Sequence, residues 1–247
     1  MQQLFQSAPH PTRRLLLYLN GWALGPVAVA HLGQPKDRDL LILWDYREDA
    51  LTFDFSTYEE IQIVAWSMGV WATDRLLERL PSLRDRITTA TALGGTGYPM
   101  DDRYGIPETI YLATLESITE ANRPRFNRQM VGGKTYRHLH ADLSARSTEA
   151  IREELLRPYA LTHASLRPVP KPAAQGVWTK AYIGTDDRVV PPASQRIYWK
   201  EQGVATEEIK DGVHYLLGYF SSWEELLIAD CEGILDVAPL APLFALP

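Results

Sequence analysis

The stretch that decides the fold is Ile61–Leu80, IQIVAWSMGVWATDRLLERL. Its first part, Ile61–Trp66, is a short, mainly apolar and β-branched run, which is typical of a buried strand. From Val70 onward the bulky residues recur at helical spacing, which predicts an amphipathic helix over Val70–Leu80. A strand therefore passes directly into a helix, and the tight turn between them holds a serine, Ser67.

A serine in such a turn is either an ordinary turn residue or a nucleophile held up at the end of a strand. The sequence Ala65-Trp66-Ser67-Met68-Gly69 matches the G-x-S-x-G nucleophile elbow, with alanine in place of the first glycine. In that elbow the positions two before and two after the nucleophile crowd against backbone and must be small, as Ala65 and Gly69 are. This context favours Ser67 as a nucleophile.

Outward from this turn, further short apolar runs have the length of buried strands. They are Leu15–Leu19, Leu40–Trp44, Thr88–Leu93 and Val177–Ile183. Helical patterns separate most of them, and this alternation predicts a mostly parallel sheet covered by helices on both faces. We also expect Ser56-Thr57-Tyr58-Glu59 to act as a capping box that starts a short helix before the strand at Ile61.

The alternation stops between about residues 107 and 170. This stretch reads as helical, with Pro107 suited to a first helical position and Arg152–Tyr159 a strong helix former. A proline-rich segment, LRPVPKPAAQG, follows it as an extended return. We therefore expect one α/β domain over residues 1–247, with a helical lid over 107–170 at the carboxyl edge of the sheet, where such folds place ligands.

Composition narrows the class of protein. The chain has 247 residues, 45% of them apolar, and a net charge of −6, which argues against non-specific nucleic-acid binding. A single cysteine, Cys231, excludes an internal disulfide, fits a reducing compartment and is best explained as core filler. The apolar run near the N-terminus is too short for a signal peptide or a membrane span, so we expect a cytoplasmic protein with no membrane partner.

Charge is unevenly distributed along the chain. Residues 121–171 hold ten basic and four acidic residues, a net +6, which leaves −12 for the rest. This segment is either a solvated helical surface or a docking face for an acidic partner. The basic residues at its start, which a docking face would use, are Arg123, Arg125 and Arg128.

A serine nucleophile needs a base, and the chain has six histidines. In hydrolases with this elbow the order is serine, acid, histidine, and the histidine follows the last strand. His214 suits that place, because it follows a short strand candidate and a turn. His138 and His140 have a spacing that could suit a metal on a strand, but no cysteine or carboxylate cluster accompanies them, which favours polar surface; we expect no metal and no cofactor.

The orienting acid is expected at the end of another strand. In IGTDDRVVPP, residues 183–192, Asp187 follows a buried strand in a loop, where a carboxylate can hold an imidazole tautomer. Its neighbour Asp186 is the rival, although in an extended loop the two side chains point in opposite directions. Asp45, at the end of another predicted strand, is a more distant alternative.

Acyl transfer also needs donors for the developing oxyanion. One is the backbone N–H of Met68, directly after the nucleophile, and the N–H of Trp22 in the loop after the first buried strand is the second. The alternative is that Asn20-Gly21 forms only a tight turn. The side chains of Trp22, Trp66 and Met68 would give an apolar throat, although Trp66 could equally belong to the core.

These segments together resemble a known family. The resemblance runs from about Arg14 to Leu227 and rests on YLNGWALG, LWDYRE, VAWSMGVWA, ALGGTGYPMDDRYGIPETI, FNRQM, IGTDDRVVPP followed by YW, and HYLL. The chain resembles the BioG family of pimeloyl-acyl-carrier-protein methyl ester esterases, which have the α/β-hydrolase fold. Its most specific parts are AWSMGVW and GGTGYPMDDRYGIP.

The resemblance implies a biotin-pathway esterase that acts on a pimeloyl methyl ester carried by acyl carrier protein. By position it assigns the nucleophile to Ser67, the acid to Asp187, the base to His214 and the oxyanion donors to Trp22 and Met68. By analogy with BioH-type esterases, Phe126 and Met130 would line the acyl channel together with Trp22. One departure is Gly94-Gly95-Thr96 where Asn-Gly-Thr is expected, which puts a local hydrogen bond in doubt.

Two other functions stay open. The same triad would serve an acyl thioesterase or a general carboxylesterase, which substrate preference would distinguish. A catalytically inactive hydrolase fold acting as a binding protein is the third possibility, and labelling of Ser67 by a fluorophosphonate would separate it from the enzymes.

Overall fold

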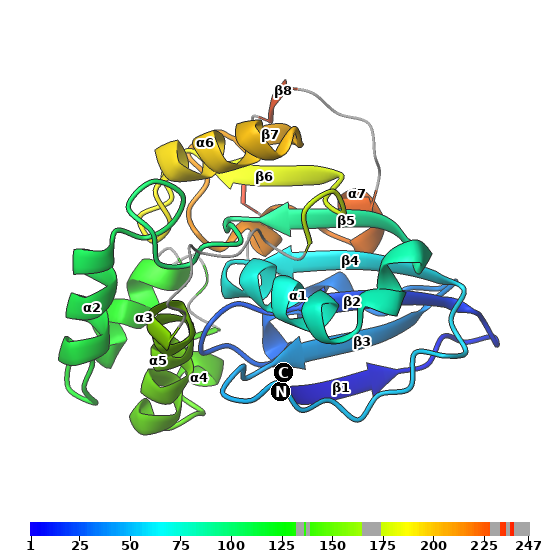
Figure 1. The fold of residues 1–247 in the computed structure, drawn as a ribbon, viewed down its shortest axis with the longest axis horizontal. Coiled ribbons are helices and arrows are strands. Elements are labelled where there is room, and N and C mark those ends of the chain that lie inside the picture. The colour runs from blue at the N-terminus through cyan, green and yellow to red at the C-terminus, as the bar shows by residue number, and fades with distance from the viewer. Residues whose placement is uncertain (132–135, 137–138, 165–173, 228–232, 236–237, 240–247) are drawn as a thin grey trace.

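A computed structural model describes residues 1–131, 136, 139–164, 174–227, 233–235 and 238–239. Within these residues eight strands form one sheet in the order β1-β3-β2-β4-β5-β6-β7-β8 (Figure 1). All neighbouring pairs are parallel except β1 with β3, which is antiparallel. In the same residues we find no helix that is long and apolar enough to cross a membrane.

The strands follow the apolar runs of the sequence closely. Their bounds are β1 Gln2–Gln6, β2 Arg14–Leu19, β3 Asp39–Trp44, β4 Glu60–Trp66, β5 Ile87–Leu93, β6 Lys180–Gly184, β7 Ala205–Ile209 and β8 Gly233–Leu235. The central strands β2 and β4 are buried on both faces, which is why they appear in the sequence as nearly continuous apolar runs.

Helices cover both faces of this sheet. They are the 3-10 helix η1 Pro26–Leu32, α1 Met68–Arg79, η2 Pro81–Arg86, α2 Glu108–Ser117, α3 Arg123–Val131, α4 Leu139–Leu143, α5 Thr148–Ala164, α6 Pro192–Gln202, η3 Leu216–Tyr219 and α7 Trp223–Leu227. In Figure 1, α1 lies in front of the sheet and α7 behind it, and both contact β4. The expected α/β-hydrolase architecture of a mostly parallel sheet flanked by helices is confirmed.

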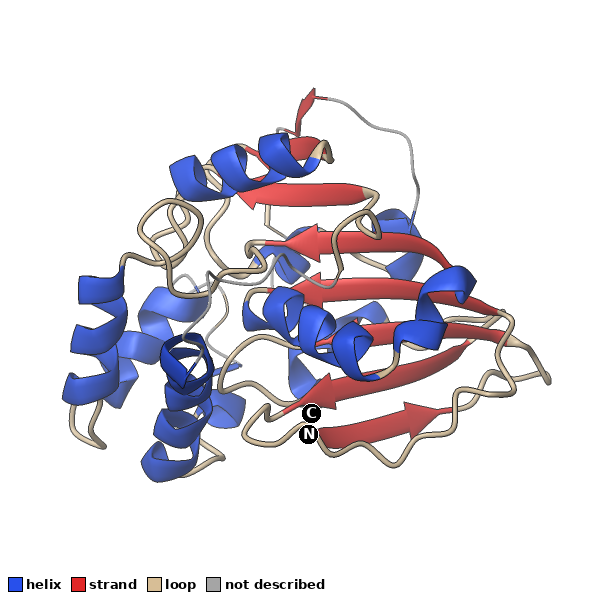
Figure 2. Cartoon of the chain, in the orientation of Figure 1, coloured by secondary structure: helices blue, strands red, loops and turns tan. Residues whose placement is uncertain are grey.

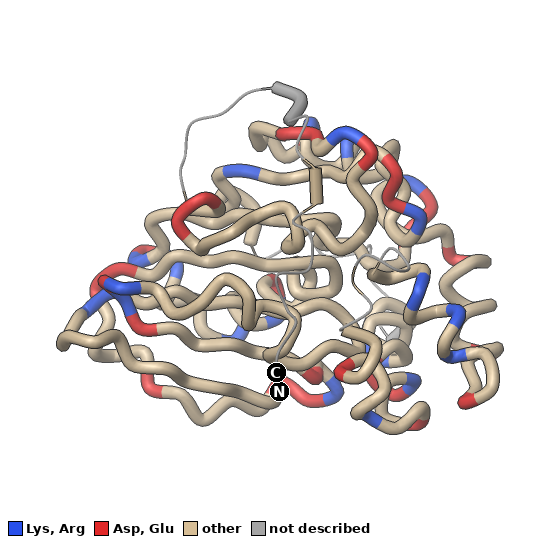
Figure 3. Tube along the Cα trace, turned by 180° about the vertical axis from the view of Figure 1, so that it is seen from behind, with Lys and Arg blue, Asp and Glu red and all other residues tan. Residues whose placement is uncertain are grey.

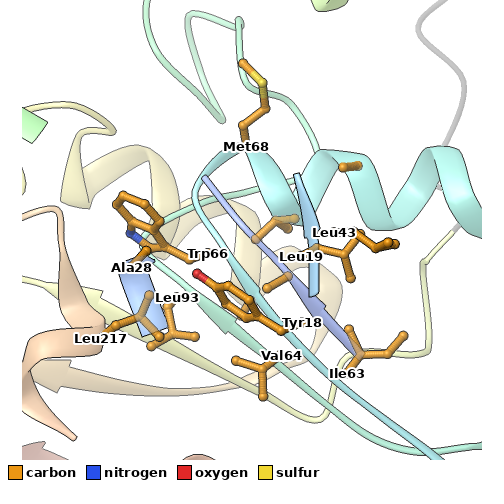
Figure 4. Close-up of a cluster of buried hydrophobic side chains, with 14 of the residues drawn as sticks. Tyr18, Leu19, Ala28, Leu43, Ile63, Val64, Trp66, Met68, Leu93 and Leu217 are labelled. Carbon is orange, nitrogen blue, oxygen red and sulfur yellow. The ribbon is translucent and has the colours of Figure 1, made fainter. Parts of the chain in front are cut away.

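The core lies where β2 and β4 meet the helices. Tyr18 of β2 and Trp66 of β4 are both fully buried, and Figure 4 shows both side chains among aliphatic side chains of the sheet. Met68, at the start of α1, points away from this cluster (Figure 4). Trp66, the last residue of β4, therefore faces the core, while Met68, two residues later, points away from it.

Four helices gather at one edge of the sheet. Figure 2 shows them beyond the arrowheads of the parallel strands, at the carboxyl edge. We call α2–α5 the cap helices; they fill most of the stretch in which we expected a helical lid. The proline-rich return predicted after them falls largely on residues 165–173, outside the described part of the chain.

Two local predictions were wrong. The strand expected at Val177 begins only at Lys180, because a turn bonded from the Val177 N–H to the Ala174 carbonyl occupies the preceding residues. No helix starts at Ser56, which instead bonds Asp54 through both its N–H and its hydroxyl, so its side chain caps nothing.

Candidate active site

The serine turn is a sharp strand-to-helix elbow. Strand β4 ends at Trp66, helix α1 begins at Met68, and Ser67 between them has φ +55°. Such backbone geometry is uncommon for a residue other than glycine and costs of order 1–3 kcal/mol, which the surrounding packing must offset. At Gly69 a Cβ atom would collide with the carbonyl oxygens of Leu19 and Asn20, so the small residue expected there is a steric requirement.

Three polar side chains meet at this elbow. The Ser67 Oγ lies 2.9 Å from the His214 Nε2, and the His214 Nδ1 lies 2.9 Å from the Asp187 Oδ2. Ser67 follows β4, Asp187 follows β6 and His214 follows β7. Because these strands are parallel, their carboxyl ends share one edge, and the sheet brings together three residues that are far apart in sequence.

The carboxylate of Asp187, and not that of Asp186, faces the imidazole. Asp186 is turned outward and pairs with Arg188. Asp187 is buried, and its Oδ1 accepts the backbone N–H groups of Val189 and Val190 at 2.8 and 3.0 Å. Asp45, the other alternative, pairs with Arg47 and Arg146 instead.

One residue near the acid was missed from the sequence. Gln195, fully buried on α6, donates from its Nε2 to the Asp187 Oδ2 at 3.0 Å and to the Val190 carbonyl at 2.8 Å. Gly94 has φ +55°, and a Cβ there would sit 3.2 Å from the His214 carbonyl oxygen.

Trp66 belongs to the core and does not line the throat. It is fully buried, its indole N–H donates to the His214 carbonyl at 2.8 Å, and its ring packs 5.3 Å from the imidazole. The residue before the serine therefore fixes the backbone of the histidine.

The predicted oxyanion donors border the same pocket as the serine. Trp22 and Met68 line it with Ser67 and His214. Asn20, buried in the loop after β2, donates to the Gly25 carbonyl at 2.6 Å and so closes the loop that carries Trp22. Among the described residues, no acceptor bonds the backbone N–H of Trp22 or of Met68. Both N–H groups are thus available to a ligand.

The pocket is mainly apolar and extends outward under the cap helices. Its inner part reaches from Ser67 and His214 to Met130 and Leu155. An outer part shares Trp22, Met130 and Leu155 with it and continues to Phe126, Gln129 and Arg188. Met130 thus lines both parts and Phe126 lines the outer part; that they line an acyl channel stays a prediction.

The three arginines expected to dock an acidic partner differ from one another. Arg123 is only 4% exposed, and its guanidinium donates to the Leu143 carbonyl inside the cap. A buried guanidinium cannot contact a docked protein, so this expectation was wrong for Arg123. Arg125 and Arg128 are exposed on α3.

Other basic residues of the +6 segment also face inward. Arg146 pairs with Glu154 and Asp45, and Arg157 pairs with Asp49. Figure 3 shows basic and acidic positions interspersed along the described cap helices. Four further basic residues lie outside the described residues: Lys134, Arg137, Arg167 and Lys171.

Within the described part of the chain, no group of three or more histidine, cysteine or carboxylate side chains could hold a metal ion. His163 lies near Glu108 on the cap surface. His138 and Cys231 fall outside the described residues.

A family model described as Pimeloyl-ACP methyl esterase BioG matches residues 4–226. The crystal structure of BioG from Haemophilus influenzae is 36% identical, covers 93% of this chain and 100% of its own, and superposes with a TM-score of 0.78. A protein from Burkholderia cenocepacia, provisionally described as an aryl esterase, has a similar fold, with a TM-score of 0.63 and 14% identity. The match covers 86% of this chain and 87% of that protein.

Two curated proteins are also similar. One, from Haemophilus influenzae, is described as uncharacterized; it is 38% identical over 212 residues, which are 86% of this chain and 93% of that protein. The other is a malonyl-[acyl-carrier protein] O-methyltransferase from Bacteroides fragilis, 35% identical over 216 residues. That match covers 84% of this chain and 40% of the methyltransferase.

Proposed function

Because this chain belongs to the BioG family of pimeloyl-ACP methyl esterases, we propose that it hydrolyses the methyl ester of a pimeloyl chain carried by acyl carrier protein. The observation that carries the proposal is the continuous hydrogen-bonded arrangement of Ser67, His214 and Asp187 at the inner end of an apolar channel. The reaction releases methanol and frees the distal carboxylate.

In the proposed reaction, Ser67 attacks the carbonyl carbon of the methyl ester while His214 takes the proton from its Oγ. Asp187 orients the imidazole and stabilises the imidazolium that forms, and it remains ionised. The two backbone N–H groups and the Gln195 amide that face Asp187 stabilise its negative charge. The imidazolium then protonates the departing methoxide, methanol leaves, and an acyl-enzyme remains on Ser67.

The second half of the reaction uses the same groups. His214 takes a proton from water as the water attacks the acyl carbon. The imidazolium then returns a proton to the Ser67 Oγ as its bond to the acyl carbon breaks, and the pimeloyl carboxylate forms. In each half the negative oxygen of the tetrahedral intermediate is stabilised by the backbone N–H groups of Met68 and Trp22, and one such donor is worth about 3–4 kcal/mol of barrier.

The channel suits an aliphatic chain tethered at its far end. Its outer part, lined by Phe126 and Met130, favours methylene groups, and Arg125 and Arg128 lie exposed on the same helix, where they would attract an acidic carrier protein. The similarity to part of a malonyl-[acyl-carrier protein] O-methyltransferase supports a carrier-bound substrate, since removing a methyl ester is the reverse change to placing one.

The test is hydrolysis of purified pimeloyl-carrier methyl ester, compared with the free pimelate methyl ester. We expect a higher kcat/KM for the carrier-bound ester, and Ser67→Ala should lower kcat on either ester by about 10⁴-fold or more while leaving the melting temperature nearly unchanged. A Ser67→Ala variant that kept substantial activity would contradict the assignment.

Two other outcomes define the alternatives. Preferential release of the chain from its carrier thioester would favour a thioesterase, and equal rates on unrelated esters would favour a general carboxylesterase. A natural chain in which a fluorophosphonate does not label Ser67 would indicate an inactive hydrolase fold that binds without catalysis.

A further inference from the structure

One buried carboxylate in the cap has no part in the reaction above. Glu154, on α5, is fully buried, and the hydrogen-bond partners of its side chain among the described residues all lie outside α5. Its Oε1 accepts the backbone N–H of Tyr46 at 2.9 Å, and its Oε2 accepts the backbone N–H of Ala23 at 3.2 Å and the Arg146 guanidinium at 2.6 Å. A cap residue thus bonds two loops of the core.

The loop reached through Ala23 is the one that carries the predicted oxyanion donor. Ala23 directly follows Trp22 and has φ +68°, a left-handed conformation that a residue with a side chain rarely adopts without outside contacts. The N–H that Ala23 donates to Glu154 is one such contact. The peptide joining Trp22 to Ala23 is thereby fixed on one side.

The same helix holds Trp22 as well. The Trp22 indole N–H donates to the Ile151 carbonyl at 2.7 Å, and Ile151 lies three residues before Glu154, on the same face of α5. The two consecutive loop residues are therefore bonded to one turn of a cap helix. The position of the Trp22 backbone N–H depends on where that turn lies.

The carboxylate has one charged partner, the Arg146 guanidinium. Burial raises the pKa of Glu154, and the nearby Arg146 guanidinium opposes that rise. Arg146 also pairs with Asp45 at the end of β3, so the ion-pair group spans the cap and the core. A buried carboxylate with three donors is costly to remove, because each donor would lose its acceptor.

We propose that Glu154 is a positioning residue, through which helix α5 sets the Trp22–Ala23 backbone and so completes the oxyanion site. The proposal rests on the function proposed above. It makes catalytic competence depend on the docking of α5 against the core, since the serine, histidine and aspartate follow strands of the sheet and make no bond to a cap helix within the described residues, whereas the Trp22–Ala23 loop is bonded to α5.

The test compares three variants on p-nitrophenyl butyrate. Glu154→Gln keeps the length of the side chain but presents an N–H to one of its donors, and Glu154→Asp keeps the charge but shortens the reach to Ala23. Glu153→Gln is the matched control, since Glu153 is an exposed neighbour on the same helix that pairs with Arg47. Melting temperature and near-ultraviolet circular dichroism report folding.

We expect Glu154→Gln and Glu154→Asp to lower kcat by about 10- to 100-fold with KM changed less than about threefold, because a misplaced donor weakens transition-state binding selectively. Glu153→Gln should match the natural chain. A kcat within about twofold of the natural value in a folded Glu154 variant would overturn the proposal. So would failure of both variants to fold, because the carboxylate would then serve the fold rather than the loop. A natural chain without esterase activity would instead contradict the proposed function.

Discussion

The edge of the sheet and the cap helices use buried charge in different ways. At the sheet edge Asp187 is buried next to the imidazole and its two oxygens accept from groups that surround the site. In the cap Arg123 and Arg146 are turned inward, where they bond a carbonyl and a carboxylate that hold the cap together or attach it to the core. In the function proposed above, buried charge at the edge serves chemistry, whereas much of the buried charge in the cap attaches one element to another.

The largest test of this contrast is at the sheet edge. Asp187→Asn should lower kcat on p-nitrophenyl butyrate by about 10⁴-fold, because the amide presents the wrong hydrogen-bond pattern to the imidazole. The control is Asp186→Asn, one residue away and paired with Arg188 at the surface, which should keep activity within about twofold. Equal losses of kcat in the two variants would mean that the buried carboxylate of Asp187 has no special role in the reaction.

A second test concerns a buried acid that lies in the core and has no catalytic contact. Asp74 on α1 accepts the Ala174 N–H, while its Oδ2 has no hydrogen-bond partner among the described residues, and burial raises its pKa to about 7. Since the ordinary value is 3.8, the folded state keeps a proton that the unfolded chain has lost between about pH 4 and 7. Its stabilising contribution is therefore present below pH 4 and is lost as the pH rises to 7.

Asp74→Asn should remove the loss of stability that the natural chain shows between about pH 4 and 7. At pH 8 the variant should exceed the natural chain in free energy of unfolding by roughly 4 kcal/mol, at about 1.4 kcal/mol per pKa unit, and the difference should vanish near pH 4. Urea unfolding at both pH values measures it, with the exposed Asp85→Asn as control. A pH-independent difference would mean that Asp74 is ionised in the folded state.

Within the cap, the contrast predicts that Arg123 contributes to stability and Arg125 does not. Arg123→Met should lower the free energy of unfolding by about 2 kcal/mol, since the Leu143 carbonyl and the Thr148 hydroxyl would lose a charged donor. Arg125→Met, at an exposed site on the same helix, should change it by less than about 0.5 kcal/mol. Two equal values in urea unfolding would show that Arg123 is not an internal anchor.

The smallest effect is expected at the exposed face of the cap. The double variant Arg125→Glu and Arg128→Glu should raise KM for the carrier-bound ester by about 3- to 10-fold, with the difference shrinking as salt rises. Small-ester hydrolysis should not change. Reversing Arg79 and Lys200, which are exposed at the ends of α1 and α6, alters net charge equally and should leave both substrates unaffected. Equal effects on both substrates would remove docking as the cause.

The sheet and the positions of its polar residues could be predicted because strand ends limit where a residue can be. An apolar run fixes where β4 and β6 end, so Ser67 and Asp187 had to lie at the same edge. The cap could be predicted as helical, but not which of its arginines would be buried, because that depends on contacts between helices. Arg123 and Arg125 are two residues apart and look alike in sequence.

Two residues of the site were missed for the same reason. Gln195 and Glu154 contact groups from distant parts of the chain, and local periodicity carries no information about such partners. Glu154 did leave a trace, since it falls at helical spacing after Ile151 and beside Leu155, both buried, so that an acid shares an apolar face. Gln195 left none that we can identify.

The separation of Ser67 and His214 by 147 residues also affects how the enzyme comes into being. A nascent chain that has emerged only as far as α6 holds Ser67 and Asp187 but still lacks His214, so with the proposed triad it is inactive during most of its synthesis. Pairing of β5 with β6 joins segments about 90 residues apart, and contacts of such long range form slowly. Return of esterase turnover after dilution from denaturant would therefore time the completion of the sheet.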